Sequence, residues 1–136
     1  MTNFGSVEEN KAIIQNLYAF FKSGEGAKIA AIFHPKIEWK QMEGFPNGGT
    51  YIGTKEVFKN VFSQFANQWS GWGAVAEEFI PAGKRVFVLG YYKGKSIEAG
   101  KYMEAPLVHI YTLKNGLITH FRQYTDTHVV QNALKK

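Results

Sequence analysis

The chain has 136 residues, contains no cysteine and carries a formal net charge of +5 at pH 7. This length predicts one domain over residues 1–136, and the lack of cysteine excludes disulfides, thiolate metal ligands and cysteine nucleophiles. The fourteen lysines and two arginines are scattered along the chain. Because nucleic-acid-binding proteins concentrate such residues on one face, we expect no nucleic-acid partner.

The first ten residues lack the basic and apolar pattern of a signal peptide, and no apolar run reaches membrane-spanning length. We therefore expect a cytoplasmic protein without a membrane partner. Aromatic residues make up 15% of the chain. That is more than a small core needs, which favours a partly open cavity lined by aromatic rings.

Helices dominate the predicted first half of the chain. Ser6 and Glu9 have the spacing of a capping box, apolar residues follow at helical spacing, and Gly24 suits the end of this first helix. A short second helix is predicted over Ala27–Phe33, because the approach to a proline disfavours further helix. A third helix is predicted over residues 53–68.

Strands are predicted for most of the remainder. Residues 36–43 ("KIEWKQME") alternate so that Ile37, Trp39 and Gln41 share one face, and "GFPNGG" follows as a loop. This order predicts an α+β domain in which helices cover one face of a curved antiparallel sheet. Turn signals divide the second half into four strands and a final helix: Trp72–Ile80, Arg85–Tyr92, Lys101–Leu113, Leu117–Thr125 and Thr127–Leu134.

The turn "KNG" between the last two strands has two interpretations. A two-residue turn would pair Lys114 with Leu117 and place His109 on the same face as Arg122. A three-residue loop would pair Leu113 with Leu117, so that His109 shares a face with Phe121 and Gln123. We adopt the second, which also points Ile118, His120, Arg122 and Tyr124 outward.

Several separated motifs carry a family resemblance: "FHPKIEW", "YIGTKEV" and "GKYMEAPLVHIYTLKNGLITHFRQYTDT". In this order they resemble the SnoaL-like branch of the nuclear transport factor 2-like superfamily, which includes ketosteroid isomerases, polyketide cyclases and limonene epoxide hydrolases. The resemblance covers nearly the whole chain. It implies a cystatin-like, cone-shaped barrel with a pocket between the concave sheet face and the helices, and a homodimer through the outer sheet face.

The resemblance also singles out His109 and Gln123. His109 falls where the isomerases keep an oxyanion-hole aspartic acid and the cyclases a histidine. A histidine there can donate a hydrogen bond to a carbonyl or transfer a proton; the alternative is a core histidine satisfied by its neighbours. Gln123 falls where the cyclases and epoxide hydrolases have a cavity aspartate. Because glutamine is no base at neutral pH, this departure argues against aspartate-driven chemistry.

Two further positions follow from the same comparison, and Glu43 follows from strand alternation. Trp39 lies where the isomerases place their general base, and an indole takes no proton. Leu17 occupies the place of the oxyanion-hole tyrosine, with Tyr18 beside it as the residue that can face inward. Glu43 shares the strand alternation of Trp39 and is the carboxylate predicted to reach the cavity mouth. Burial there would raise its pKa and make it a usable base. The alternative is that Glu43 lies at an exposed strand end.

The leading functional hypothesis is a protein that binds a flat, largely apolar ligand. An enzyme of this kind would be an isomerase, cyclase or dehydratase acting on an apolar carbonyl or polyketide-like compound, with His109 and Glu43 as catalytic residues. The alternative is a non-catalytic ligand-binding or dimeric protein-interaction module, so enzymatic activity stays open. The predicted ligand contacts are aromatic residues and two glutamines: Tyr18, Trp39, Gln41, Phe58, Phe62, Tyr111, Phe121 and Gln123.

Neither a metal nor a cofactor is expected. The four histidines lack the close spacing of a metal site, and no glycine-rich phosphate loop occurs. Asp126, the only aspartate, stands between the last predicted strand and the final helix. We predict that it caps this helix instead of acting in catalysis.

Overall fold

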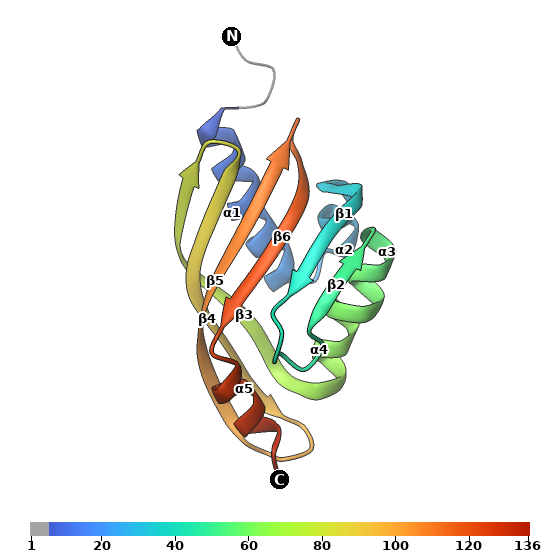
Figure 1. Cartoon of the computed structure of the whole chain (residues 1–136), viewed down its shortest axis with the longest axis vertical. Coiled ribbons are helices and arrows are strands. Elements are labelled where there is room, and N and C mark those ends of the chain that lie inside the picture. Colours follow the sequence, from blue (N-terminus) through green and yellow to red (C-terminus); the bar gives the residue numbers. More distant parts are fainter. Residues whose placement is uncertain (1–5) are drawn as a thin grey trace.

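A strongly curved sheet of six strands carries the helices of the computed structural model, which describes residues 6–136 (Figure 1). The prediction that the first ten residues carry no signal-peptide pattern therefore falls partly outside the described residues. The sheet order is β2-β1-β6-β5-β4-β3. The strands are β1 (Phe33–Gln41), β2 (Gly49–Ile52), β3 (Trp69–Ala82), β4 (Arg85–Ser96), β5 (Tyr102–Lys114) and β6 (Leu117–Thr125).

The predicted α+β class is confirmed, with two refinements of the sheet. It is mixed, because β1 runs parallel to β6 while the other neighbouring strands are antiparallel. It is also unclosed, since β2 and β3 form its two edges. The short strand β2 was not predicted; it pairs with β1 through residues that the sequence assigns only to a loop and a helix start.

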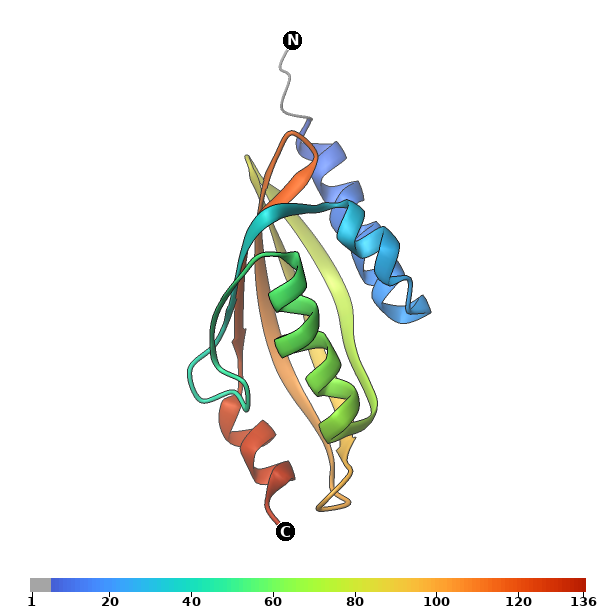
Figure 2. The same cartoon turned by 90° about the vertical axis from the view of Figure 1, so that its right-hand side faces the viewer.

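The helices lie along the concave side of the sheet, with α5 at the end nearest the C-terminus (Figure 2). Ser6 caps α1 with the predicted capping box, and Gly24 ends it in the left-handed conformation. The predicted helix over residues 53–68 is present but contains a π-helical turn. The helices are α1 (Val7–Ser23), α2 (Gly26–Ala31), α3 (Thr54–Val57), η1 (Phe58–Phe62), α4 (Ser63–Gln68) and α5 (Thr127–Leu134). None of the described helices is long and apolar enough to cross a membrane.

The hairpin between β5 and β6 combines features of both predicted turns. Lys114 pairs with Leu117, so the three-residue loop was wrong, and Asn115 and Gly116 both have positive φ. A bulge then leaves Thr119 without a partner and restores the alternation. His109 therefore pairs with Gln123 on the concave face, as predicted. The two-residue turn pairs Ile118 with the inward residue Leu113, so Ile118 is fully buried and its predicted outward position was wrong.

Buried apolar residues form two groups along the concave face. The first, here called the α1 cluster, comprises fifteen residues around Ile14, Leu17 and Trp39. The second, the α5 cluster, lies at the opposite end of the sheet and is covered by α5. It consists of Phe45, Trp69, Tyr92, Met103, Ala105, Leu107, Val130 and Ala133.

Candidate functional site

His109 lies between two tyrosine hydroxyls where the two clusters meet. Its Nδ1 is 2.5 Å from the hydroxyl of Tyr18 on α1, and its Nε2 is 2.6 Å from the hydroxyl of Tyr92 on β4. The Tyr18 hydroxyl also contacts that of Tyr111, at 2.8 Å. Strand alternation on β5 points His109 and Tyr111 inward, and the helical stripe of α1 places Tyr18 above them.

Gln123 extends this network from β6. Its Oε1 accepts a hydrogen bond from the backbone N–H of Met42 at 3.0 Å, which fixes the orientation of the amide. Its Nε2 then donates to the Tyr92 hydroxyl at 2.7 Å. We refer to Tyr18, Tyr92, His109, Tyr111 and Gln123 as the His109 network. The Gln123 amide therefore helps to orient the Tyr92 hydroxyl.

The His109 network is electrically neutral at physiological pH. Burial lowers the pKa of His109 to about 3, because the charged imidazolium would lose its hydration inside the protein. Burial likewise raises the pKa of Tyr18, Tyr92 and Tyr111 above the ordinary value. The network can therefore donate and accept hydrogen bonds, but it holds no charge with which to bind an ion.

Aromatic rings surround the network on the side of the α1 cluster. Trp39 stacks on Phe121 with 3.7 Å between ring centroids, and its edge-on neighbour is Phe62 at 5.3 Å. The Trp39 indole N–H donates to Gln41 at 2.9 Å. Phe58 lies farther out, packed against Phe62 at 5.1 Å. The predicted ligand contacts therefore gather in one region, with Phe58 at its margin.

The two acidic residues of interest lie outside this region. Glu43 follows β1 in a turn and its side chain is exposed, so the structure does not bring it to the His109 network. Asp126 caps α5, where its carboxylate accepts a hydrogen bond from the Val129 N–H at 3.1 Å. The predicted cap is thus confirmed. Among the described residues no cluster of acidic, histidine or cysteine side chains fits a metal ion.

Tyr92 is the network residue that sequence reasoning missed. Tyr92 shares the inward face of β4 with Val86 and Val88, and all three are buried. Val88 pairs with His109, so the inward face of β4 runs directly beside it. Because Tyr91 and Tyr92 are adjacent and chemically alike, the strand pairing was needed to tell which one faces inward.

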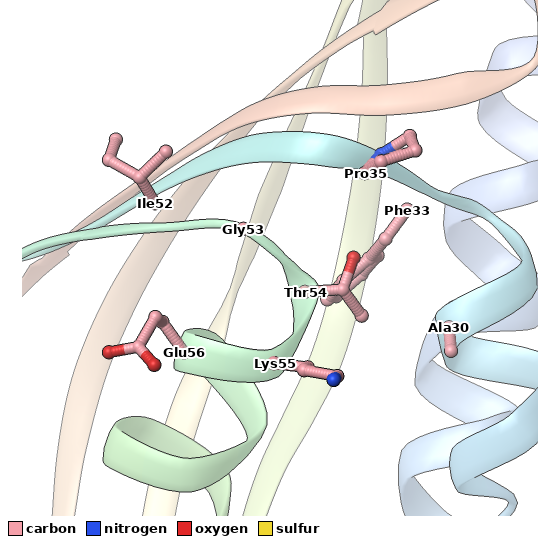
Figure 3. A pocket seen from close by; sticks show the side chains of 8 residues that line it. All are labelled: Ala30, Phe33, Pro35, Ile52, Gly53, Thr54, Lys55 and Glu56. Carbon is pink, nitrogen blue, oxygen red and sulfur yellow. The ribbon is translucent and has the colours of Figure 1, made fainter.

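A pocket of about 500 Å³ lies away from this network, between α2, the ends of β1 and β2, and the start of α3 (Figure 3). Phe33 forms its base, while Thr54, Lys55 and Glu56 lie along its α3 side. None of the predicted site residues lines it. The remaining lining residues are Ala30, Pro35, Ile52 and Gly53.

Comparisons with known proteins identify the fold and the family. An NTF2-like protein from Burkholderia thailandensis is 33% identical, with a TM-score of 0.90 over 93% of this chain and 98% of that one. TerC, co-crystallised with polyporic acid, is 27% identical, with a TM-score of 0.85 over 94% and 99% of the two chains. No curated protein matches.

A third solved structure shares the fold at much lower identity. It is a putative SnoaL-like polyketide cyclase from Shewanella denitrificans, 12% identical, with a TM-score of 0.75 over 92% of this chain and 96% of that one. At this identity the likeness concerns the fold alone. The model of the SnoaL-like domain matches residues 14–121, which include every residue of the His109 network except Gln123. The chain belongs to the family of SnoaL-like domains.

Proposed function

We propose that the protein binds a small, largely apolar molecule that carries a carbonyl or similar oxygen, in the interior around His109. The observation that carries this proposal is the neutral histidine held between two tyrosine hydroxyls. Buried neutral donors favour an uncharged or delocalised acceptor, because they offer directed hydrogen bonds but no compensating charge. The surrounding rings of Trp39, Phe62 and Phe121 suit a flat ligand.

A structural relative supports the ligand class. TerC, which is 27% identical and aligns over nearly its full length, was co-crystallised with polyporic acid. We therefore take polyporic acid as the first compound to test.

A reaction at this site would be an isomerisation, cyclisation or dehydration through an enol-like intermediate, without a metal. The His109 network would stabilise the developing oxyanion by hydrogen bonding. The base would be Glu43 or a water molecule held near Gln123, as the sequence suggested. Glu43 is exposed in a turn, however, and the amide of Gln123 is committed to Met42 and Tyr92.

One observation favours the non-catalytic alternative. The buried polar residues of the described chain are Asn10, Gln41, Ser96, His109 and Gln123, and none of them is a carboxylate. An interior without a buried acid has hydrogen-bond donors for a ligand but no strong base for proton abstraction. Ligand binding without turnover is therefore the second candidate function.

We also propose a homodimer through the outer face of the sheet and a cytoplasmic location. The outward residues Phe87, Leu89, Val108 and Ile110 of β4 and β5 are only half-buried in the single chain. A second copy would cover this apolar surface. Sedimentation should then give twice the mass of one chain, and Val108→Lys should reduce it to that of the monomer.

The binding proposal is tested by calorimetric titration with polyporic acid, planar ketones and aromatic acids. Wild-type protein should bind at least one of these compounds. His109→Phe and Tyr18→Phe should weaken that binding, while the matched variant Tyr124→Phe, which alters an exposed phenol, should not. Equal binding by all four proteins would contradict the proposed site. Unchanged turnover of any substrate in both His109→Ala and His109→Phe would exclude a catalytic role for His109.

A further inference from the structure

The His109 network holds one more proton than its internal contacts use. Its three tyrosine hydroxyls and the single N–H of neutral His109 supply four protons. Only three contacts join these four groups: Tyr111 to Tyr18, Tyr18 to His109, and His109 to Tyr92. Gln123 donates a proton of its own to the Tyr92 hydroxyl, so it accepts none of these four protons. One hydroxyl proton is therefore left without a protein acceptor among the described hydrogen bonds.

The tautomer of His109 decides where that proton lies. With the proton on Nδ1, Tyr92 donates to Nε2 and the surplus hydroxyl is Tyr18 or Tyr111. With the proton on Nε2, the ring donates to Tyr92, and Tyr92 accepts from both His109 and Gln123. The hydroxyl proton of Tyr92 is then free to point toward the α5 cluster, of which this side chain is a member.

A donor that is unpaired whatever the tautomer lies in the same cluster. The indole Nε1 of Trp69 is buried, with 3% of the residue exposed, and it has no hydrogen-bond partner among the described residues. An unpaired buried donor is costly, because it has given up its hydrogen bonds to water without gaining a partner. The orphaned indole N–H of Trp69, in the same cluster as a Tyr92 hydroxyl whose proton the Nε2 tautomer leaves free, points to a molecule that supplies the acceptor.

The two side chains are linked through neighbouring residues of the cluster. The Trp69 ring covers Gly94, where an added Cβ would come within 3.3 Å of a ring carbon. Gly94 and Tyr92 are two residues apart on the same inward face of β4, which is about 7 Å along a strand. Trp72 lies between, stacked on Tyr92 at 4.8 Å and 5.4 Å from Trp69. A flat molecule of two or three rings is long enough to span these neighbouring side chains.

The cover over this region comes from two segments that contact each other. Val130 and Ala133 of α5 and Phe45 of the loop after β1 are buried in the α5 cluster. The Gln131 side chain of α5 donates to the Gly44 carbonyl of that loop at 2.9 Å. Displacement of α5 and this loop would open the cluster to a ligand without disturbing the α1 cluster.

We propose that Tyr92 and Trp69 form an oxygen-binding subsite in the α5 cluster, which takes a planar aromatic molecule carrying a carbonyl or other acceptor oxygen. The subsite deepens the proposed function and rests on it. It places the ligand oxygen on the α5 side of His109, with Tyr92 as the specificity-determining donor. His109 acts through Tyr92, because the Nε2 tautomer releases the Tyr92 proton for the ligand.

The test is a titration of the ¹⁵N-labelled full chain with 9-fluorenone and with fluorene, two flat molecules of nearly equal shape. They differ in the carbonyl oxygen of fluorenone. We expect fluorenone to bind about tenfold more tightly, the effect of one or two hydrogen bonds. The indole N–H resonance of Trp69, identified by its loss in Trp69→Phe, should shift with fluorenone and not with fluorene. Tyr92→Phe should remove the preference, and Tyr124→Phe should keep it.

Each other outcome is decisive. Equal affinity for the two compounds, or a preference that persists in Tyr92→Phe with an unmoved Trp69 resonance, overturns the subsite. A preference that is lost in Tyr18→Phe but kept in Tyr92→Phe retains the proposed function and moves the oxygen to the α1 side. Failure of both compounds and of polyporic acid to bind overturns the proposed function and the subsite together.

Discussion

The surroundings of two tryptophans show how differently the two ends of the interior are built. Trp39 and Trp69 are both 3% exposed, and both lie among aromatic rings. The Trp39 N–H donates to Gln41, whose amide in turn donates to Asn47 at 3.3 Å. The Trp69 N–H has no partner among the described residues. Equal burial therefore conceals a difference in hydrogen bonding, because protein acceptors satisfy one indole and not the other.

The region around Trp39 should be the one that holds the fold together. Trp39→Ala removes a ring stacked on Phe121 and leaves a large cavity, so the free energy of unfolding should fall by about 3–5 kcal/mol. Urea denaturation followed by circular dichroism measures this change. A loss below about 1 kcal/mol would mean that the α1 cluster is not the stabilising part of the interior.

His109, at the junction of the two regions, should make stability depend on acid. Its pKa is about 3 in the folded protein and near 6.5 when unfolded. Between these values the unfolded chain binds a proton that the folded chain does not. The contribution of neutral His109 is therefore fully present above pH 6.5 and is lost as the pH falls toward 3.

Within that window the free energy of unfolding should fall by up to about 1.4 kcal/mol for each pH unit of acidification. Denaturation curves at a series of pH values test it, with His109→Phe as the reference, since this variant lacks the titrating group. Identical pH dependence in the two proteins would show that His109 is not buried in its neutral form.

The same conservative change at each tryptophan should have unequal effects. Trp39→Phe leaves the buried Gln41 oxygen without its donor, whereas Trp69→Phe removes a donor that is already unpaired. The first variant should therefore be less stable than the second by about 1–3 kcal/mol. Thermal and urea unfolding of the pair measure this difference. A larger loss at Trp69 would indicate a buried partner for its N–H.

The smallest expected effect concerns the cover of the region around Trp69. Asp126→Ala removes the cap of α5 and should cost about 0.5–2 kcal/mol. Asp126→Asn is the control that keeps a capping side chain. Amide exchange should quicken in α5 but not in α1. Uniform quickening across the chain would show that α5 does not open independently.

The fold was largely readable because it depends on local patterns. The capping box of α1, the Asp126 cap of α5 and the alternation of β5 all act within a few residues, and each was predicted correctly. The strand β2 and the parallel pairing of β1 with β6 were not predicted. Both depend on which distant segments meet, and a pattern within one segment does not contain that information.

The site was less readable for the same reason. The inward positions of His109 and Gln123 followed from strand alternation, but their partner Tyr92 follows only from the pairing of β4 with β5. The orientation of Gln123 depends on a backbone N–H at Met42, which is 81 positions away. Glu43 was expected near the interior from its alternation with Trp39, but the strand ends at Gln41 and the alternation ends with it.

The unpaired Thr119 has a consequence for how this hairpin can change by insertion and deletion. Continuous pairing from the two-residue turn would send Gln123 to the outer face, and the bulge cancels that inversion by leaving Thr119 out of the pairing. Deletion of Thr119 would make Leu113–Ile118 and Thr112–His120 consecutive pairs, so Phe121 and Gln123 would stay in the interior. Deletion of Arg122 would instead pair Gln123 with Ile110 and turn it outward, because the strand beyond the bulge has no spare residue. The position of a length change in this strand, and not its size, therefore decides whether the interior survives.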